Sequence, residues 1–375
     1  MASRTALEAG QIPERSDDLA SDVSAHARAT NDASGFSETA LGGAATQACN
    51  ALWKPADAVF NRRMRAGVSF EMPDGETVRF WTYEDSDAPA HEPSLLSPLI
   101  RICEQQQARI TLETHREVLT SRMRRAARSI AMHRPEPVWF ETHESYTYHW
   151  QPMSSGTWFY QSHVSTARHF EMGLYGVIVV EPDPDQDGRR RASRHGPAYD
   201  VERLWVFDDV DPNWHDVALD GAALTRGLPA PAFKPQYFLI NGVPNTQALN
   251  HAGVAVEAKR GEKVLLRLMN AGFSLVKVQL HGLAAQIIAV DGNTLGGADR
   301  PWTRWIDVAP GQPVHLATAS RYDLLIDLGS AHGGCVEPGD YLATFEFQDG
   351  RRMVHNAGAS HPARAGRAAT TIRVL

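Results

Sequence analysis

Cysteine is scarce in this chain of 375 residues, which holds only Cys49, Cys103 and Cys335. Because their number is odd and no two form a Cys-x-x-Cys pair, the sequence predicts neither a disulfide framework nor a cysteine-ligated zinc site. An excess of basic residues is also missing. The formal net charge is -7, which argues against a nucleic-acid partner. The one arginine cluster, within residues 122–128, is interpreted as a solvated loop or edge.

Long apolar runs are absent as well. The N-terminal stretch has no apolar segment after its first charges, so it does not resemble a signal peptide, and no later run is long enough to span a bilayer. These absences predict a cytoplasmic protein without a membrane partner. The nucleophile-elbow, phosphate-loop and dinucleotide-binding fingerprints are missing too, which removes the commonest enzyme motifs.

What the sequence does contain is a series of short alternating runs rich in β-branched and aromatic residues, with a turn signal about every ten residues. Pro-Asp-Gly splits two such runs near residues 67–85 and predicts a hairpin. No long helical period follows, although a short helix is expected near residues 46–64. We therefore predict an all-β protein built from two linked β-sandwiches.

The composition changes along the chain and suggests its organisation. Residues 1–60 are rich in small and polar residues and predict an irregular N-terminal extension. Residues 61–185 form the first predicted domain and residues 198–375 the second. Between them, residues 186–197 have the composition of a linker.

Several phrases recur in a recognisable order. In the first half these are "VRFWTYED", "ESYTYHWQPMSSGTWFY" and "HFEMGLYGVIVVEP", and in the second "YFLINGVPN", "LLRLMNAG" and "RYDLLID". These phrases resemble the cupredoxin domains of the multicopper oxidase family. They occur in the expected order from about Val68 to the C-terminus and look most like two-domain members. The resemblance implies two cupredoxin-like Greek-key β-sandwiches, oxidation of phenols, amines or metal ions, and a homotrimer as a partner arrangement.

The resemblance also implies copper ligands, but several of their positions hold other residues. A type 1 copper needs two imidazoles, one thiolate and a weak axial ligand. By alignment with the family's motifs, Arg128 stands at the first imidazole position, Ser162 at the thiolate, His169 at the second imidazole and Leu174 at the axial position. A serine hydroxyl does not replace a soft thiolate, so a type 1 site is not expected.

The oxygen-reducing copper cluster of the family is similarly incomplete here. Ala131 and Gln161 replace two of its histidines in the first domain, whereas His133 and His163 keep two others. In the second domain Gln279 and His281 occupy a comparable pair. The retained metal candidates are thus His133, His163, His169 and His281, each of which is also interpretable as an ordinary packed or surface histidine.

Three further features have competing interpretations. His143 and His149 could face the same side of a strand, but a solvent-facing position is favoured. Met172 lies beside His169, two positions short of the family's axial residue, and is predicted to pack in the core. The acidic run around Asp208 suggests either a hard-cation site or a solvated acidic turn, and the turn is favoured.

Together these observations predict a multicopper-oxidase-like protein that has lost the type 1 site and most ligands of the copper cluster. Its former copper cleft would bind a small-molecule ligand or substrate, or support altered oxidative chemistry. Two alternatives stay open. One is a copper oxidoreductase with a reduced mononuclear site around His133 and His163. The other is a copper-free structural or interaction module.

Overall fold

The computed structural model describes residues 57–87, 94–114, 145–162, 166–182, 188–219, 232–297, 300–329, 336–349 and 363–375. Two compact units, Met1–Gly35 and Phe36–Leu375, divide the chain, and every described residue lies in the second. The predicted N-terminal extension therefore falls outside the described residues up to position 56. The division of the remainder into two domains with a linker stays a prediction.

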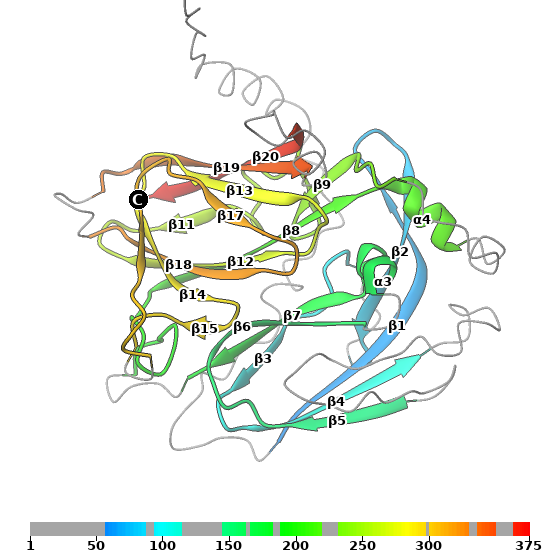
Figure 1. The fold of residues 1–375 in the computed structure, drawn as a ribbon, viewed down its shortest axis with the longest axis horizontal. Coiled ribbons are helices and arrows are strands. Elements are labelled where there is room, and N and C mark those ends of the chain that lie inside the picture. The colour runs from blue at the N-terminus through cyan, green and yellow to red at the C-terminus, as the bar shows by residue number, and fades with distance from the viewer. Residues whose placement is uncertain are drawn as a thin grey trace, which may run out of the picture. The chain divides into compact units, whose positions relative to one another are not determined.

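The described residues up to position 182, called the first half below, form two sheets (Figure 1). One has the order β2-β1-β4-β5 and the other the order β3-β7-β6. The strands are β1 (Asp57–Glu71), β2 (Thr77–Asp85), β3 (Ile100–Cys103), β4 (Gln107–Thr114), β5 (Ser145–Trp150), β6 (Gly156–Gln161) and β7 (Tyr175–Glu181), and helix α3 (Thr166–Glu171) joins β6 to β7.

The described residues from position 188 on, called the second half, form two larger sheets. Their orders are β10-β9-β8-β12-β18-β14-β15, with β16 on β14, and β11-β20-β19-β13-β17. The elements are β8 (Val201–Val210), α4 (Pro212–Leu219), β9 (Tyr237–Ile240), β10 (Val243–Pro244), β11 (Val256–Ala258), β12 (Lys263–Asn270), β13 (Leu275–Leu280), β14 (Ala285–Val290), β15 (Asn293–Thr294), β16 (Ile306–Val308), β17 (Val314–Leu316), β18 (Arg321–Asp327), β19 (Gly339–Asp349) and β20 (Ala363–Val374).

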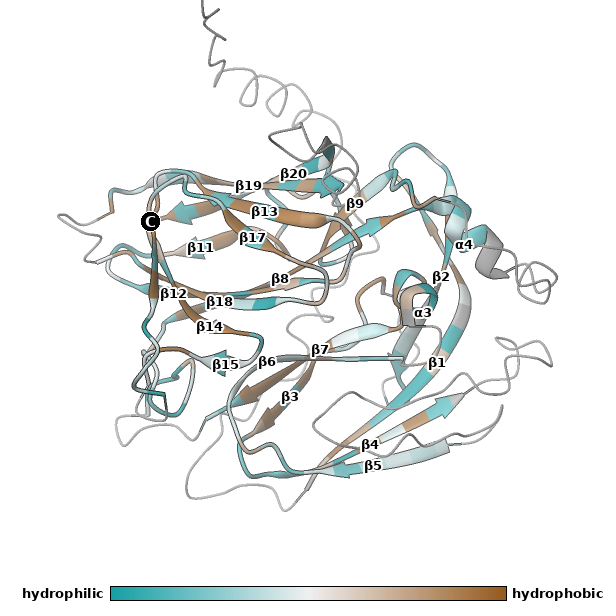
Figure 2. Ribbon diagram, viewed as in Figure 1, coloured by the Kyte–Doolittle hydropathy of each residue, from teal (hydrophilic) through white to brown (hydrophobic). Residues whose placement is uncertain are grey.

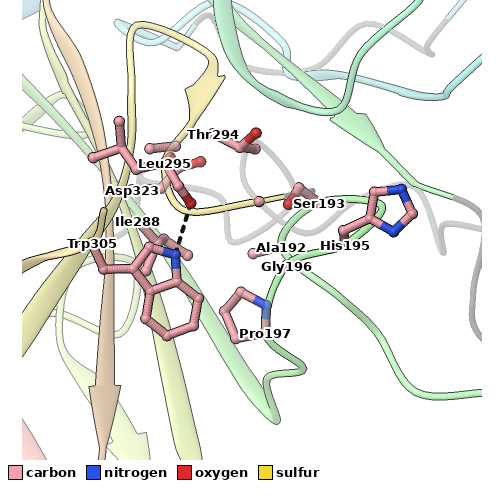
Figure 3. A pocket seen from close by; sticks show the side chains of 12 residues that line it. Ala192, Ser193, His195, Gly196, Pro197, Ile288, Thr294, Leu295, Trp305 and Asp323 are labelled. Carbon is pink, nitrogen blue, oxygen red and sulfur yellow. Dashed lines mark hydrogen bonds between the residues drawn. The ribbon is translucent and has the colours of Figure 1, made fainter. Parts of the chain in front are cut away.

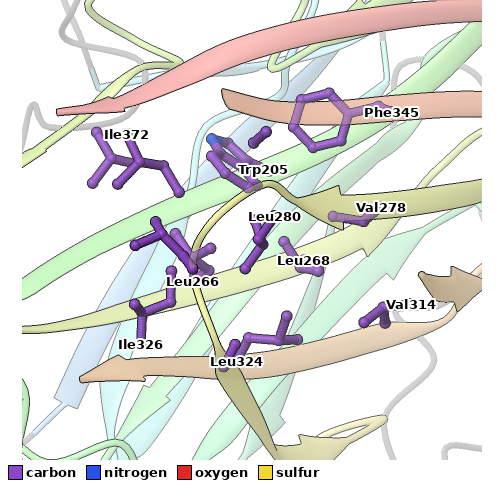
Figure 4. Packing of buried hydrophobic residues seen from close by; sticks show 14 of the residues in the cluster. Trp205, Leu266, Leu268, Val278, Leu280, Val314, Leu324, Ile326, Phe345 and Ile372 are labelled. Atoms are coloured by element: carbon purple, nitrogen blue, oxygen red, sulfur yellow. The ribbon is translucent and has the colours of Figure 1, made fainter. Parts of the chain in front are cut away.

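Each half buries its own core between its sheets, as the alternating runs predict. In the second half, Trp205 and Leu266 from the larger sheet pack with Val278, Phe345 and Ile372 from the smaller one (Figure 4). Strand β13 alternates between half-buried and buried side chains, whereas every residue of β7 is buried. Figure 2 shows strands that are mostly hydrophobic, such as β3 and β13, and the paler strand β5. The predicted all-β sandwich fold is confirmed.

The predicted hairpin is also confirmed, but the short helix is wrong where the structure describes it. Strands β1 and β2 pair antiparallel, from Glu71↔Thr77 to Arg62↔Asp85. Residues 57–64, assigned to a helix from local pattern, lie in β1 and pair in parallel with β4, Asp57 opposite Gln107. The pairing with a segment some 50 residues away decided the conformation, because a long strand is stabilised by its neighbours more than by local propensity.

Two observations bear on the expectations about cysteine and the membrane. Cys103 is disulfide-bonded, which the odd number of cysteines did not lead us to expect; Cys49 and Cys335 lie outside the described residues. Among the helices of the described residues, none is both long and apolar enough to cross a membrane.

Candidate functional site

Three of the four positions expected for type 1 copper come together where β6 ends and β7 begins. Ser162 Oγ and His169 Nδ1 share a hydrogen bond of 2.7 Å, and both side chains are buried. The backbone N–H of Ser162 donates to the carbonyl of Leu174 at 3.1 Å, and the N–H of Leu174 donates to the carbonyl of His169 at 2.9 Å. The fourth position, Arg128, lies outside the described residues.

The local fold explains why these residues meet. Strands β6 and β7 pair antiparallel, and the short α3 carries the chain across from one to the other. Gly173 allows the tight exit from α3, since it has a φ of 102° and a Cβ there would stand 2.7 Å from the carbonyl oxygen of Trp81. A side chain at this position would be strained both by the backbone conformation and by that contact.

The surroundings of His169 keep its imidazole neutral. Burial, and then the positive charge of Arg168, lowers the pKa of His169 to about 4. The indole of Trp81 packs edge-on against the imidazole, with ring centroids 5.3 Å apart. Leu174 is fully buried and offers no lone pair. A hydroxyl, one imidazole and an aliphatic side chain do not match the donors of a type 1 copper, so the residues present do not fit that metal.

The positions expected for the copper cluster are only partly described. Ala131, His133 and His163 lie outside the described residues, and Gln161 is the half-buried last residue of β6. The metal roles considered for His133 and His163 therefore stay predictions.

In the second half, the comparable pair makes ordinary hydrogen bonds. Gln279 Nε2 donates to the carbonyl of Gly311 at 2.8 Å. His281 is exposed, and its Nε2 lies 2.8 Å from Thr344 Oγ1. Across the part of the chain that the structure describes, no three or more His, Cys, Asp or Glu residues are grouped so that they could hold a metal ion.

Met172 packs as predicted, but the acidic run does not. Met172 is fully buried in the core of the first half. Asp208, Asp209 and Asp211 were expected in a solvated turn, yet all three are buried. The local sequence concealed this, because the groups that hydrogen-bond to the three aspartates come from distant parts of the chain.

Hydrogen bonds satisfy the three buried aspartates. Asp208 accepts from the hydroxyl of Tyr175 at 2.7 Å, and Asp209 accepts from the backbone N–H of Phe273 at 2.6 Å. Asp211 accepts from the backbone N–H of Lys234 at 2.7 Å. Next to them lie Glu171 and His215, which sequence reasoning did not single out because they stand 44 positions apart and belong to no motif.

One small cavity is lined by five residues between positions 192 and 197 and by others from the second half, including Ile288, Trp305 and Asp323 (Figure 3). The indole N–H of Trp305 donates to the carbonyl of Leu295 at its edge. The volume of the cavity is about 10 Å³, which is room for about one water molecule and not for a substrate. This cavity is therefore not a site for the predicted small-molecule ligand.

The two sandwiches and the strand–helix–strand segment around His169 define a cupredoxin-type fold, and comparisons with known proteins agree. Residues 136–185 match the model of a multicopper oxidase domain family. No curated protein matches the sequence.

Solved structures share the fold at low sequence identity. A blue copper oxidase from Nitrosomonas europaea is 17% identical, with a TM-score of 0.57 over 85% of this chain and 86% of its own. The multicopper oxidase mgLAC is 18% identical, with a TM-score of 0.56 over 85% and 86%. A copper nitrite reductase from Nitrosomonas europaea is 16% identical, with a TM-score of 0.53 over 85% and 94%. The resemblance to multicopper oxidases is thus confirmed in the fold and, over residues 136–185, in the sequence.

Proposed function

We propose that this chain is a multicopper-oxidase-like protein that does not assemble a type 1 copper and does not catalyse ordinary laccase chemistry. The hydrogen bond between Ser162 and His169 carries the proposal. The Nδ1 atom of the one retained imidazole is engaged by a hydroxyl at 2.7 Å, at the position where the resemblance implies a thiolate. Without a type 1 copper, the family's route for electrons into the oxygen-reducing cluster has no entry.

The fate of the former copper cleft follows as part of the proposal. The cleft serves for ligand binding or altered oxidative chemistry. Copper is held at most in a mononuclear site with fewer ligands, around His133 and His163. Assembly as a homotrimer belongs to the same proposal. The disulfide at Cys103 weighs against the cytoplasmic location expected from the sequence, because disulfides persist mainly in oxidising compartments.

Copper loading of the purified full-length chain tests the central proposal. The protein is produced with copper supplied, and its copper content and visible spectrum are measured. We expect a colourless protein whose copper content does not change in the His169→Asn variant. A blue protein with near-stoichiometric copper would overturn the proposal. Colourless protein that loses about one copper per chain in the His133→Ala variant would identify the reduced site instead.

A further inference from the structure

A buried histidine and a buried glutamate face each other where α3 of the first half meets α4 of the second. His215 lies in α4, and its Nδ1 stands 2.7 Å from the backbone carbonyl of Arg79 in β2. A carbonyl only accepts, so Nδ1 carries the proton and Nε2 of the neutral ring presents a lone pair. The ring is wedged edge-on against Phe80, with centroids 4.5 Å apart, which fixes its direction.

The lone pair of His215 points at another acceptor. Glu171 is the last residue of α3, and its Oε1 accepts from the backbone N–H of Asp211 at 3.0 Å. The same Oε1 lies 3.4 Å from Nε2 of His215, and both side chains are 1% exposed. Neither Nε2 nor the second oxygen, Oε2, has a hydrogen-bond partner. Two buried acceptors repel each other unless something positive lies between them, which is either a proton or a metal ion.

The separation favours the metal. A proton shared between a carboxyl oxygen and an imidazole nitrogen draws the two atoms to about 2.7–3.2 Å. Two ligands of a tetrahedral zinc ion, each bound at about 2.0–2.1 Å, stand about 3.3–3.4 Å apart. The observed 3.4 Å between Glu171 Oε1 and His215 Nε2 agrees with the second arrangement.

The partners around the pair are those that orient metal ligands. A metal-binding histidine typically donates its other ring N–H to a carbonyl or carboxylate, as His215 does to Arg79. The carboxylate of Glu171 is itself fixed by the N–H of Asp211. Two carboxylate oxygens and one imidazole nitrogen give three donor atoms from two residues. The remaining coordination positions are left to water or a backbone oxygen.

The carboxyl groups around the pair are buried and lack a basic partner. Burial, followed by the negative charge of Asp209, raises the pKa of Glu171 well above its usual range. Burial and then the charge of Glu171 do the same to the pKa of Asp208. These shifts mean that the two carboxyl groups hold their protons more readily, and no arginine or lysine among the described residues pairs with them directly. A divalent cation between Glu171 and His215 would displace the proton from Glu171 and supply the positive charge in its place.

We propose that Glu171 and His215 bind one divalent transition-metal ion of the Zn²⁺ class at the contact of α3 with α4. This site differs from the Ser162–His169 position and does not depend on the proposed loss of type 1 copper. Because both ligands are buried, the ion enters as the chain folds. It then fastens the first half to the second through α3, β2 and α4.

Metal retention after refolding tests the proposal. The full-length chain is unfolded with its disulfide intact, refolded with Zn²⁺ or with a chelator, and desalted before elemental analysis. We expect about one Zn²⁺ per chain and a higher Tm for the zinc-refolded protein. In the variants Glu171→Gln and His215→Asn, retained zinc falls at least about tenfold. Asn keeps an N–H near the position of Nδ1, so the bond to Arg79 is preserved.

Matched controls separate this pair from other histidines. The variants His281→Asn and His169→Asn remove imidazoles outside the pair and should retain zinc as the unchanged protein does. Co²⁺ refolded into the unchanged chain should give the intense visible absorption of a tetrahedral site, which decides the question even if a variant fails to fold. Unchanged protein that retains no zinc, or His215→Asn that retains as much, would overturn the proposal.

Discussion

Ser162 and His169 stand at two positions where the resemblance to multicopper oxidases implies type 1 copper ligands, and their side chains bond to each other. A thiolate at the end of β6 would give a soft ligand beside the imidazole, whereas the hydroxyl of Ser162 hydrogen-bonds to Nδ1 at 2.7 Å. The two side chains belong to the protein core, since both are buried.

Removing that hydroxyl should destabilise the protein. In the Ser162→Ala variant, Nδ1 of His169 is left buried without its partner, and we expect a loss of about 1–3 kcal/mol in the free energy of unfolding. Urea denaturation measures it. The Ser69→Ala variant, at an exposed position of β1, is the control and should change little. A loss for Ser162→Ala no larger than that of the control would show that the bond adds nothing.

The neutral imidazole of His169 also predicts a pH dependence. Its pKa is lowered to about 4 in the folded chain, from about 6.5 when unfolded. Its contribution is therefore complete above about pH 6.5 and is lost as the pH falls toward 4, because the unfolded chain takes up the proton first. Between pH 7 and pH 5 this amounts to about 2 kcal/mol. Urea denaturation at both pH values should show a smaller loss of unfolding free energy for His169→Gln than for the unchanged chain. An equal loss in the two proteins would contradict this role of His169.

At the scale of elements, the segment after β7 shows a limit of composition. Residues 186–197 have the charges, glycine and proline of a linker, yet Arg190 Nη2 lies 3.2 Å from Glu181 and 2.9 Å from Glu202. Arg194 Nε donates to the buried carboxylate of Glu104 at 2.8 Å. The sequence indicates where the chain connects, but these ion pairs decide that its described part, from Gly188 on, is held in place.

Loosening this segment should expose it to protease. In the Glu104→Ala variant, Arg194 loses its ion pair and the backbone N–H of Ser155 loses the same carboxylate as acceptor. We expect limited trypsin digestion to cleave within residues 189–194 several-fold faster than in the unchanged chain. Mass spectrometry of the fragments locates the cut. The control Glu257→Ala, at an exposed position of β11, should leave the rate unchanged. Equal rates in all three proteins would show that Glu104 does not hold this segment in place.

At the scale of the molecule, the contact between the halves contains a buried network of alternating charge. Arg267 is fully buried, with Nε 2.5 Å from Glu202 and Nη1 3.1 Å from Asp323. Thr157 of β6 donates to Asp323 at 2.6 Å and so joins the first half to the network. Arg101 of β3 extends it, lying 2.9 Å from Glu202. The two halves are thus coupled by hydrogen-bonded ion pairs as well as by apolar packing.

Breaking the centre of this network should be costly. In the Arg267→Met variant, Glu202 and Asp323 remain buried without their shared cation, and we expect a loss of about 3–5 kcal/mol in the free energy of unfolding. Chemical denaturation measures it. The control is Arg373→Met, because Arg373 pairs with Asp340 at the surface, where both side chains are about half exposed. Similar losses in the two variants would show that the network does not stabilise the contact.

The sequence by itself determined the fold class and the identity of the residues at the copper positions. Alternating runs and turn signals depend on local spacing, and the motif around Ser162 and His169 is contiguous, so both are readable without a structure. Only the tertiary structure decided that β1 runs back to Asp57, that Asp208 and its neighbours are buried, and that Glu171 meets His215. These features arise between segments far apart in the chain, where burial and pairing outweigh the local pattern.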